Sequence, residues 1–227
     1  AVGIVGCNNA RVPHDEATIE LVKAFVAQDV LVVMTGCAAI AAGKHGYMTP
    51  EIMAAAGPGL REVCEAIGIP PVLHLGSCVD NSRILTVLTQ MATEGGLGED
   101  IDDLPAVGIC PEWMSEKAIS IGTYFVASGA YVIFGVHSPV GASREVVRIL
   151  SETWPAKVGG KLEFVPDHQE ILRRALAHID AKRAALGLPA WDPSRYGTSG
   201  DTPIREFLDA EAQPVLNVYS ARRAAAE

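Results

Sequence analysis

The chain has 227 residues, of which 49% are apolar and 20% charged, and its formal net charge is −9 at pH 7. This length allows one large domain or two small ones, the acidic balance argues against nucleic-acid binding, and no apolar run reaches the roughly 18 residues that cross a bilayer. The 5 cysteines are an odd number and lack the spacing of a secreted disulfide framework, so we expect a reduced, cytoplasmic protein.

Short apolar runs typical of buried strands alternate with helix-like segments along the chain. Strands are expected at 1–6, 29–36, 71–76, 105–110 and 130–135, with an edge strand at 161–165. Helices are expected at 15–28, 38–43, 50–67, 81–93, 115–128, 143–153 and 167–186, and a Gly- and acid-rich loop at 94–104. The alternation predicts an α/β fold, a Rossmann-like open parallel sheet of five to six strands with helices on both faces.

The composition changes near the C-terminus, where Pro, Gly, Ser, Asp and Ala dominate from Gly187 onward. We therefore predict a domain over 1–188 and a loosely ordered tail over 189–227 that could dock on a partner. At the other end, the chain begins at Ala1 inside a strand-like run, which indicates that sequence is missing upstream.

The ends of the predicted strands carry cysteines: Cys7, Cys37, Cys78 and Cys110 each close an apolar run. Because parallel strands end at the same edge of a sheet, these thiols should meet in the crevice where open α/β sheets bind ligands. Thiols at helix N-termini ionise readily, and grouped thiolates suit a soft metal. A buried free cysteine is the simpler alternative for any one of them, and it is our prediction for Cys64.

Polar groups accompany these thiols. Cys78 is followed at once by Asp80, Asn81, Ser82 and Arg83, which can cap a helix and support a ligand through hydrogen bonds. Lys117 lies about two turns into the segment that follows the fourth strand, near the same crevice. It could donate hydrogen bonds to an anion or act as an acid, although a solvated surface lysine is the usual alternative.

The histidines give no sign of a metal site. His74 lies in a strand interior, so we expect it to be a hydrogen-bonded core residue. The other five show no ligand spacing. Phosphate-binding motifs are also missing, since neither a Walker-type loop nor GxGxxG occurs in the sequence.

Longer segments around the selected residues resemble one family. These segments are GIVGCNN at 3–9, VLVVMTGCAAIAAGK at 30–44, GIPPVLHLGSCVDNSRI at 68–84 and CPEWMSEKAISIGTYFVASG at 110–129. Over 1–188 the chain is similar to the C-terminal domain of anaerobic nickel-dependent carbon monoxide dehydrogenase. The related hybrid-cluster (hydroxylamine reductase) proteins share the fold and the cluster-binding cysteines, but they are not expected to carry SCVDNSR or CPEWMSEKA.

The resemblance implies a role for each selected residue. Cys7 and Cys37 would bind iron atoms of a nickel–iron–sulfur cluster of the C-cluster type (Ni-4Fe-4S), and Cys78 would bind its nickel. Lys117 would hydrogen-bond the CO₂-derived group, and its positive charge would stabilise the developing carboxylate. Ile121, one turn later, would lie over the open position of the nickel. We assign no ligand role to Cys110.

The resemblance also implies partners that this chain does not contain. The reaction would be the reversible oxidation of CO with water to CO₂, two protons and two electrons. Upstream domains of the same enzyme would supply the remaining ligands, the further 4Fe-4S clusters and much of a homodimer contact, and a ferredoxin-like protein would exchange electrons. We therefore expect a fragment that is inactive alone, located in the cytoplasm, with any link to a membrane made through partners.

Two alternatives come from other functional classes. The chain could be a Rossmann-like binding or assembly domain that kept the fold without a cluster, or a redox protein of the hybrid-cluster type. The joint presence of Cys7, Cys37, Cys78 and Lys117 favours the carbon monoxide dehydrogenase prediction over the first, because a binding domain has no need for all four. The CPEWMSEKA segment favours it over the second.

Overall fold

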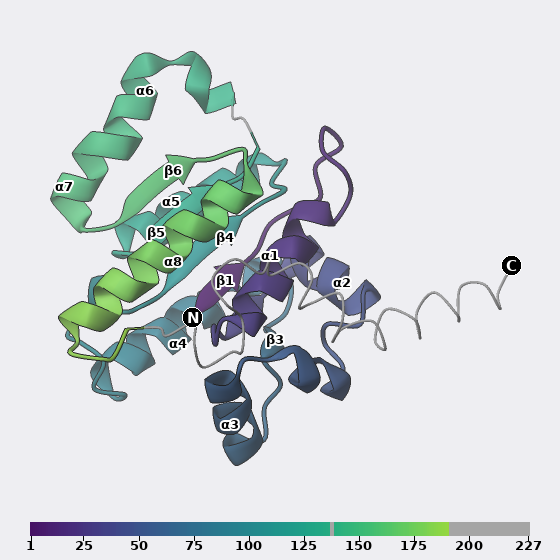
Figure 1. Ribbon diagram of the computed structural model, residues 1–227. Coiled ribbons are helices and arrows are strands. Elements are labelled where there is room, and N and C mark those ends of the chain that lie inside the picture. The colour runs from purple at the N-terminus through teal and green to yellow at the C-terminus, as the bar shows by residue number, and fades with distance from the viewer. Residues whose placement is uncertain (137–138, 191–227) are drawn as a thin grey trace, which may run out of the picture.

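The computed structural model describes residues 1–136 and 139–190, and its centre is a six-stranded parallel sheet (Figure 1). The strands are β1 (Val2–Ile4), β2 (Val32–Met34), β3 (Val72–His74), β4 (Val107–Cys110), β5 (Tyr131–Phe134) and β6 (Lys161–Phe164). All the predicted strands are present, and the sixth lies at an edge of the sheet as expected. Most of the predicted tail, from residue 191 onward, lies outside the described residues.

The strand order, β3-β2-β1-β4-β5-β6, places the first strand in the interior of the sheet. From β1 the chain builds outward to β3 on one side and then returns to build β4 to β6 on the other. This is the doubly wound order of the Rossmann fold, and ligands bind outside the carboxyl ends of the strands where the order reverses. The predicted fold class is confirmed, and the expected crevice lies between the ends of β1 and β4.

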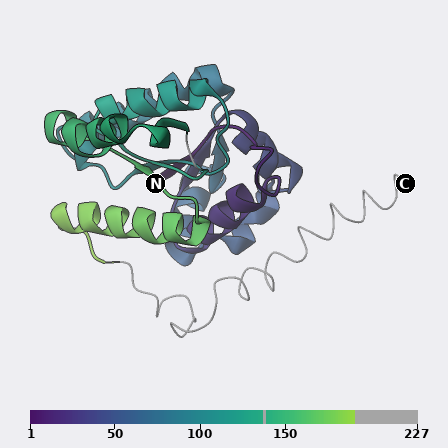
Figure 2. The ribbon, with the colours of Figure 1, turned by 90° about the horizontal axis from the view of Figure 1, so that it is seen from above.

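One face of the sheet is covered by α1 (Glu16–Ala27), α2 (Gly36–Lys44) and α8 (His168–Ala185), with α1 packed against both of the others. Alternate strand residues point into this core, among them Ile4 and Met34. A further helix, α3 (Pro58–Ile67), adds the buried side chains of Leu60 and Cys64. The view from above shows α8 on the opposite side of the strands from the teal helix that follows β4 (Figure 2).

The opposite face is covered less evenly. The helix α5 (Glu116–Ala127) packs on β4 and β5, and its Phe125 joins a second core with Phe134 and Trp113. The helix α4 (Asn81–Thr93) mainly contacts two short 3-10 turns, η2 (Cys78–Asp80) and η3 (Ile101–Asp103), rather than the strands. A cavity therefore remains between α4, α5 and the sheet.

The single helix predicted over 50–67 is wrong. The structure has a 3-10 turn, η1 (Pro50–Ala55), and then α3, separated by Gly57, which has an extended backbone with ψ of 157°. The reason is Pro58: a residue before proline avoids the helical region, while proline suits the first turn of a new helix.

The helix predicted over 143–153 is longer than expected. It consists of α6 (Arg144–Arg148), a π-helical turn η5 (Ile149–Thr153) and α7 (Trp154–Val158), and Gly159 follows α7 with φ of +74°. Pro155 lies in the first turn of α7, a position that tolerates proline because the backbone N–H is not needed there. None of the helices in the described part of the chain has the length and apolar character needed to cross a membrane.

Candidate metal centre

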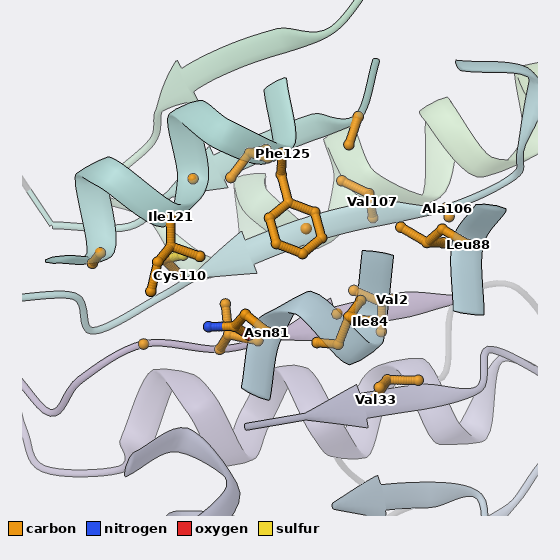
Figure 3. Close-up of a pocket in the computed structure, with 18 of the residues that line it drawn as sticks. Val2, Val33, Asn81, Ile84, Leu88, Ala106, Val107, Cys110, Ile121 and Phe125 are labelled. Carbon is orange, nitrogen blue, oxygen red and sulfur yellow. The ribbon is translucent and has the colours of Figure 1, made fainter. Parts of the chain in front are cut away.

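The thiols of Cys7, Cys37 and Cys78 line one cavity of about 430 Å³. The first follows β1, the second lies in the first turn of α2, and the third begins η2. Away from the thiols the cavity extends between α4 and α5, with an apolar wall that includes Val2, Val33, Ile84, Leu88, Val107 and Phe125 (Figure 3). The prediction that strand-end thiols share one crevice is confirmed.

The other predicted site residues divide into two groups. Lys117 and Ile121 of α5 and Asn81 of α4 line the same cavity as the thiols, as does Cys110 at the end of β4. Ser82 is exposed and is not part of the cavity wall. The cavity thus brings the proposed ligands, the lysine and the apolar isoleucine together, and it leaves out one predicted polar residue.

Cys7 has surroundings that favour its thiolate. Burial alone would raise the pKa of this thiol, but hydrogen bonds from the hydroxyl and N–H of Ser115 and from the N–H of Met114, with the positive charge of Lys117, lower the pKa below its ordinary value. The Cys7 Sγ and Ser115 Oγ atoms lie 3.6 Å apart. A thiolate is the form that binds metals, so this environment prepares the side chain for that role.

The three loops that bear these thiols are joined through their backbones. The N–H of Gly36 donates to the carbonyl of Gly76 over 3.0 Å, and the N–H of Ala38 donates to the carbonyl of Gly6 over 3.3 Å. Gly36 has φ of +62°, and a Cβ built there would lie 2.6 Å from the Sγ of Cys78. A glycine is therefore favoured on both steric and conformational grounds, because it lets the thiol of Cys78 lie directly against the backbone of the neighbouring loop.

The position of Cys78 is supported by a buried pair of polar side chains. The Oγ1 of Thr35 donates to the Oδ1 of Asn81 over 2.7 Å, and the Nδ2 of Asn81 donates to the carbonyl of Cys78 over 2.9 Å. Nearby, the carboxylate of Asp80 accepts hydrogen bonds from the N–H and hydroxyl of Ser77, which lower the pKa of Asp80. These contacts give the predicted supporting role of Asn81 a structural basis.

The remaining two cysteines are core residues. Cys64 is 1% exposed, and burial raises the pKa of its thiol, which confirms the prediction made for it. Cys110 is 2% exposed; burial, and then the negative charges of Cys7 and Cys78, raise the pKa of its thiol strongly. A thiol held neutral in this way is a poor metal ligand, which agrees with leaving Cys110 without a ligand role.

Two histidines have surroundings that the sequence did not indicate. The prediction that His74 is a core residue is wrong: it ends the edge strand β3, where its ring is exposed and Nδ1 accepts a hydrogen bond from Gly76 N–H. An edge strand has only one neighbour to cover its side chains. His178 of α8 lines the cavity, and burial, followed by the charge of Lys182, lowers its pKa to about 4.

The thiols do not converge on one point. In residues 1–136 and 139–190, no three His, Cys, Asp or Glu side chains lie close enough together to hold a single metal ion. A cluster of several metal atoms is the kind of group that thiolates spread around one cavity can share, and soft thiolates are the ligands that such clusters use. The three thiols around one cavity therefore fit part of a cluster site better than a single-ion site.

Three residues near the thiols escaped the sequence analysis: Ser115, Asn8 and Glu112. Ser115 contacts Cys7. Asn8 follows Cys7 directly in the sequence and also lines the cavity. Glu112 is fully buried and binds Asn8. The sequence held one signal for Glu112: it is the lone carboxylate in the apolar stretch 110–113. A carboxylate buried in such a stretch needs several hydrogen-bond partners, so it indicates a built polar contact.

Comparison with known proteins identifies the family. The sequence pattern of the Prismane/CO dehydrogenase family matches residues 1–169. The chain belongs to this family. It is 49% identical over 185 residues to carbon monoxide dehydrogenase 1 of Methanosarcina mazei, a match that covers 82% of this chain and 29% of the relative. The chain thus spans less than a third of the length of this carbon monoxide dehydrogenase.

Solved structures of the family have the same fold. A nickel-free carbon monoxide dehydrogenase from Thermococcus sp. AM4 is 51% identical, with a TM-score of 0.79, and the match covers 83% of this chain and 29% of that one. An acetyl-CoA synthase/carbon monoxide dehydrogenase is 35% identical, with a TM-score of 0.77 and coverage of 82% and 29%; NiZn[Fe4S4] and NiNi[Fe4S4] clusters are described in its alpha subunits. Nickel with an iron–sulfur cluster is thus described in one of these solved relatives.

Proposed function

We propose that this chain supplies part of the cluster ligands and the catalytic lysine of a carbon monoxide dehydrogenase. The overall reaction would be the reversible oxidation of CO with water to CO₂, two protons and two electrons. The single observation that carries the proposal is the cavity shared by Cys7, Cys37, Cys78 and Lys117 at the switch point of the sheet. Membership of the Prismane/CO dehydrogenase family supports it.

Cys7 and Cys37 would hold iron atoms of a nickel–iron–sulfur cluster, and Cys78 would hold its nickel. When bound, the cluster supplies the metal site at which CO and CO₂ are interconverted and from which electrons leave. The chain prepares this site through the lowered pKa of Cys7, the absence of a Cβ at Gly36 and the support that Asn81 gives to the Cys78 loop. Ser82 would contribute only indirectly, from the exposed start of α4.

The cavity wall suits a small uncharged substrate. The residues between α4 and α5 are almost all aliphatic or aromatic, as Ile84, Leu88 and Phe125 illustrate (Figure 3). Apolar surfaces of this kind exclude ions and leave room for a gas molecule such as CO. Lys117 is exposed but lines the same cavity, and its positive charge acts on the thiol of Cys7.

Lys117 and Ile121 would have different roles beside the cluster. Lys117 lies in the first turn of α5, where the helix dipole adds to its positive charge. Both favour an anionic carboxylate forming from CO over the neutral substrate, which lowers the barrier. Ile121 follows one turn later on the same helix, and its apolar side chain would lie over the open position of the nickel and limit the space beside it.

Further parts of the enzyme would complete the site. Cys7, Cys37 and Cys78 are too few to bind every metal atom of such a cluster, so upstream domains would supply the other ligands and further 4Fe-4S clusters. A homodimer partner and a ferredoxin-like redox protein would complete the route for electrons. Alone, the chain is expected to have no activity.

The test is CO-dependent reduction of methyl viologen under anaerobic conditions. The chain alone, and the chain joined to the upstream two thirds of the Methanosarcina mazei relative, would be compared after cluster assembly. We expect activity only in the joined protein, and a loss of about 100-fold or more with Lys117→Ala. Activity of the isolated chain, or a joined protein unaffected by Lys117→Ala, would overturn the proposal. A joined protein that folds but binds no metal would favour the cluster-free binding domain.

A further inference from the structure

Glu112 is a carboxylate with 0% exposure beside the candidate centre. Its Oε2 accepts hydrogen bonds from Asn8 Nδ2 over 3.2 Å and from the N–H of Asp15 over 3.0 Å. Its Oε1 accepts from the N–H of Thr18 over 3.1 Å and from the Thr18 hydroxyl over 3.0 Å. Two of these donors are free N–H groups at the N-terminus of α1, where a negative charge is favoured. The carboxylate is thus fully hydrogen-bonded without water.

These bonds join the two loops that form the candidate centre. Asn8 follows Cys7 directly in the loop after β1, and Glu112 belongs to the loop after β4. A second bond runs in parallel, from Asn9 Nδ2 to the carbonyl of Trp113 over 2.6 Å. The loop that bears the thiol is therefore fastened to the second loop at adjacent positions.

The second loop continues into the groups that face the thiol. Ser115 Oγ lies 3.6 Å from the Sγ of Cys7, and Lys117 lines the same cavity two residues later. The Nδ2 of Asn8 donates to Glu112 over 3.2 Å and also to the Oδ1 of Asp15 over 2.6 Å. Of these two bonds, the one to Glu112 ties Asn8 to the beginning of the segment 112–117, so it helps to set how Cys7 meets the turn formed by 114–117. Thr18, on the other side of the carboxylate, binds it to the body of the domain.

We propose that Glu112 is a positioning residue that acts through Asn8 to hold Cys7 against the turn at 114–117. Its importance for catalysis rests on the proposed function, because the groups it positions are the iron-binding thiol and the lysine of that site. The contact itself is formed by this chain alone and needs no metal. The two ideas can therefore fail separately.

The experiment measures the rate at which iodoacetamide alkylates each cysteine of the purified, metal-free 227-residue chain, by mass spectrometry of the cysteine peptides. The variants are Glu112→Gln, Asn8→Ala and the double variant. Glutamine keeps the size of the side chain but cannot accept at both oxygens. Two cysteines in each sample serve as internal references: exposed Cys37 for the intrinsic reaction and buried Cys64 for unfolding.

The matched control is Glu163→Gln. Glu163 is also a partly buried carboxylate with several donors, among them Tyr131 and Arg174, but it lies on β6 at the edge of the sheet. A general weakening of the domain would follow either substitution. A positioning effect would follow only the substitution of Glu112.

The rates are compared above the ordinary pKa of a thiol, so that access to the sulfur and not its ionisation sets the rate. There we expect Glu112→Gln to raise the alkylation rate of Cys7 about tenfold. The rate of Cys37 should stay within about twofold, and Cys64 should remain protected. Asn8→Ala should raise the Cys7 rate at least as much, because it also removes the bond to Asp15, and the double variant should react no faster than Asn8→Ala. The proposal is overturned by an unchanged Cys7 rate in folded Glu112→Gln or Asn8→Ala, by additive effects in the double variant, by an equal rise at Cys64, or by the same rise in Glu163→Gln. A protein joined to the upstream part of the relative that folds but binds no nickel would refute the proposed function and leave this result standing.

Discussion

Gly36 and Cys78 approach each other so closely that no side chain fits between them: a Cβ on Gly36 would lie 2.6 Å from the Cys78 Sγ. The two residues belong to the loops after neighbouring strands, β2 and β3. The contact is direct structural support for placing both loops in one site, since it brings the thiol of one loop onto the backbone of the other.

Gly36→Ala should therefore damage the site more than the fold. An alanine at φ of +62° costs about 1–2 kcal/mol in the free energy of unfolding, and the new methyl group must displace the Cys78 thiol. We expect a stable but weakened protein that loses most of its nickel on reconstitution, measured by urea unfolding and metal analysis.

The control for that experiment is Gly43→Ala, in the same helix. A Cβ at Gly43 would meet only the Met48 Sδ, at 3.9 Å, which is an ordinary contact. This change should raise the stability by about 0.5–1 kcal/mol, because alanine favours helix interiors, and should leave the metal content unchanged. Equal metal contents in Gly36→Ala and Gly43→Ala would refute the role of the close approach.

Thr35 and Asn81 should behave as one energetic unit. Asn81→Ala leaves the Thr35 hydroxyl and the Cys78 carbonyl without their partner, which should cost about 1–3 kcal/mol in the free energy of unfolding. In a double-mutant cycle with Thr35→Val, the combined loss should be smaller than the sum by about 0.5–3 kcal/mol.

Urea unfolding of the four proteins measures this coupling, with Ser82→Ala as the control. Ser82 is exposed on the same helix, so its change should stay within about 0.5 kcal/mol. Strictly additive losses for Thr35 and Asn81 would show that the buried pair does not support the Cys78 loop.

His178 should make the fold sensitive to mild acid. Burial, followed by the charge of Lys182, lowers its pKa from 6.5 to about 4. As the pH falls from about 6.5 to about 4, the unfolded chain takes up a proton that the folded chain refuses, so stability is lost across that window. Urea unfolding between pH 4 and 8 should show this loss, on the order of 2 kcal/mol, and His178→Gln should reduce it.

The control is His168→Gln, at the start of the same helix. The same pH dependence in wild type and His178→Gln would contradict the assignment.

The metal content of Cys110→Ala should show whether Cys110 is a core residue or a metal ligand. Burial, and then the negative charges of Cys7 and Cys78, raise the pKa of Cys110, so it should remain a neutral thiol during reconstitution. We expect the alanine variant to bind as much iron and nickel as wild type, with a loss of about 1 kcal/mol in stability from the smaller side chain. A large drop in metal content in a folded Cys110→Ala protein would make Cys110 a ligand.

Much of the fold was predictable because its signals are local. The strands ending near Cys7 and Cys110 are short apolar runs, and alternation with helices leaves few arrangements of a parallel sheet. The break at Gly57 was missed although Pro58 announced it, because the apolar pattern of the two flanking segments continues across it. His74 was misplaced because nothing local in the sequence says that β3 lies at the edge.

The candidate site was predictable in part for the same reason. Parallel strands end at one edge, so Cys7, Cys37 and Cys78 could be brought together without knowing any loop. The contacts of Ser115 and Glu112 depend on how the loop after β4 folds back on the loop after β1. That fold is set by tertiary packing, which local sequence patterns do not encode.

The central claim is that Cys7, Cys37 and Cys78 hold a nickel–iron–sulfur cluster, and metal analysis tests it most directly. The chain joined to the upstream part of the Methanosarcina mazei relative would be reconstituted anaerobically with iron, sulfide and nickel, beside its Cys78→Ala variant and the core control Cys64→Ala. We predict nickel bound in a fixed ratio by wild type and Cys64→Ala and lost in Cys78→Ala. The same nickel content in all three proteins would contradict the claim.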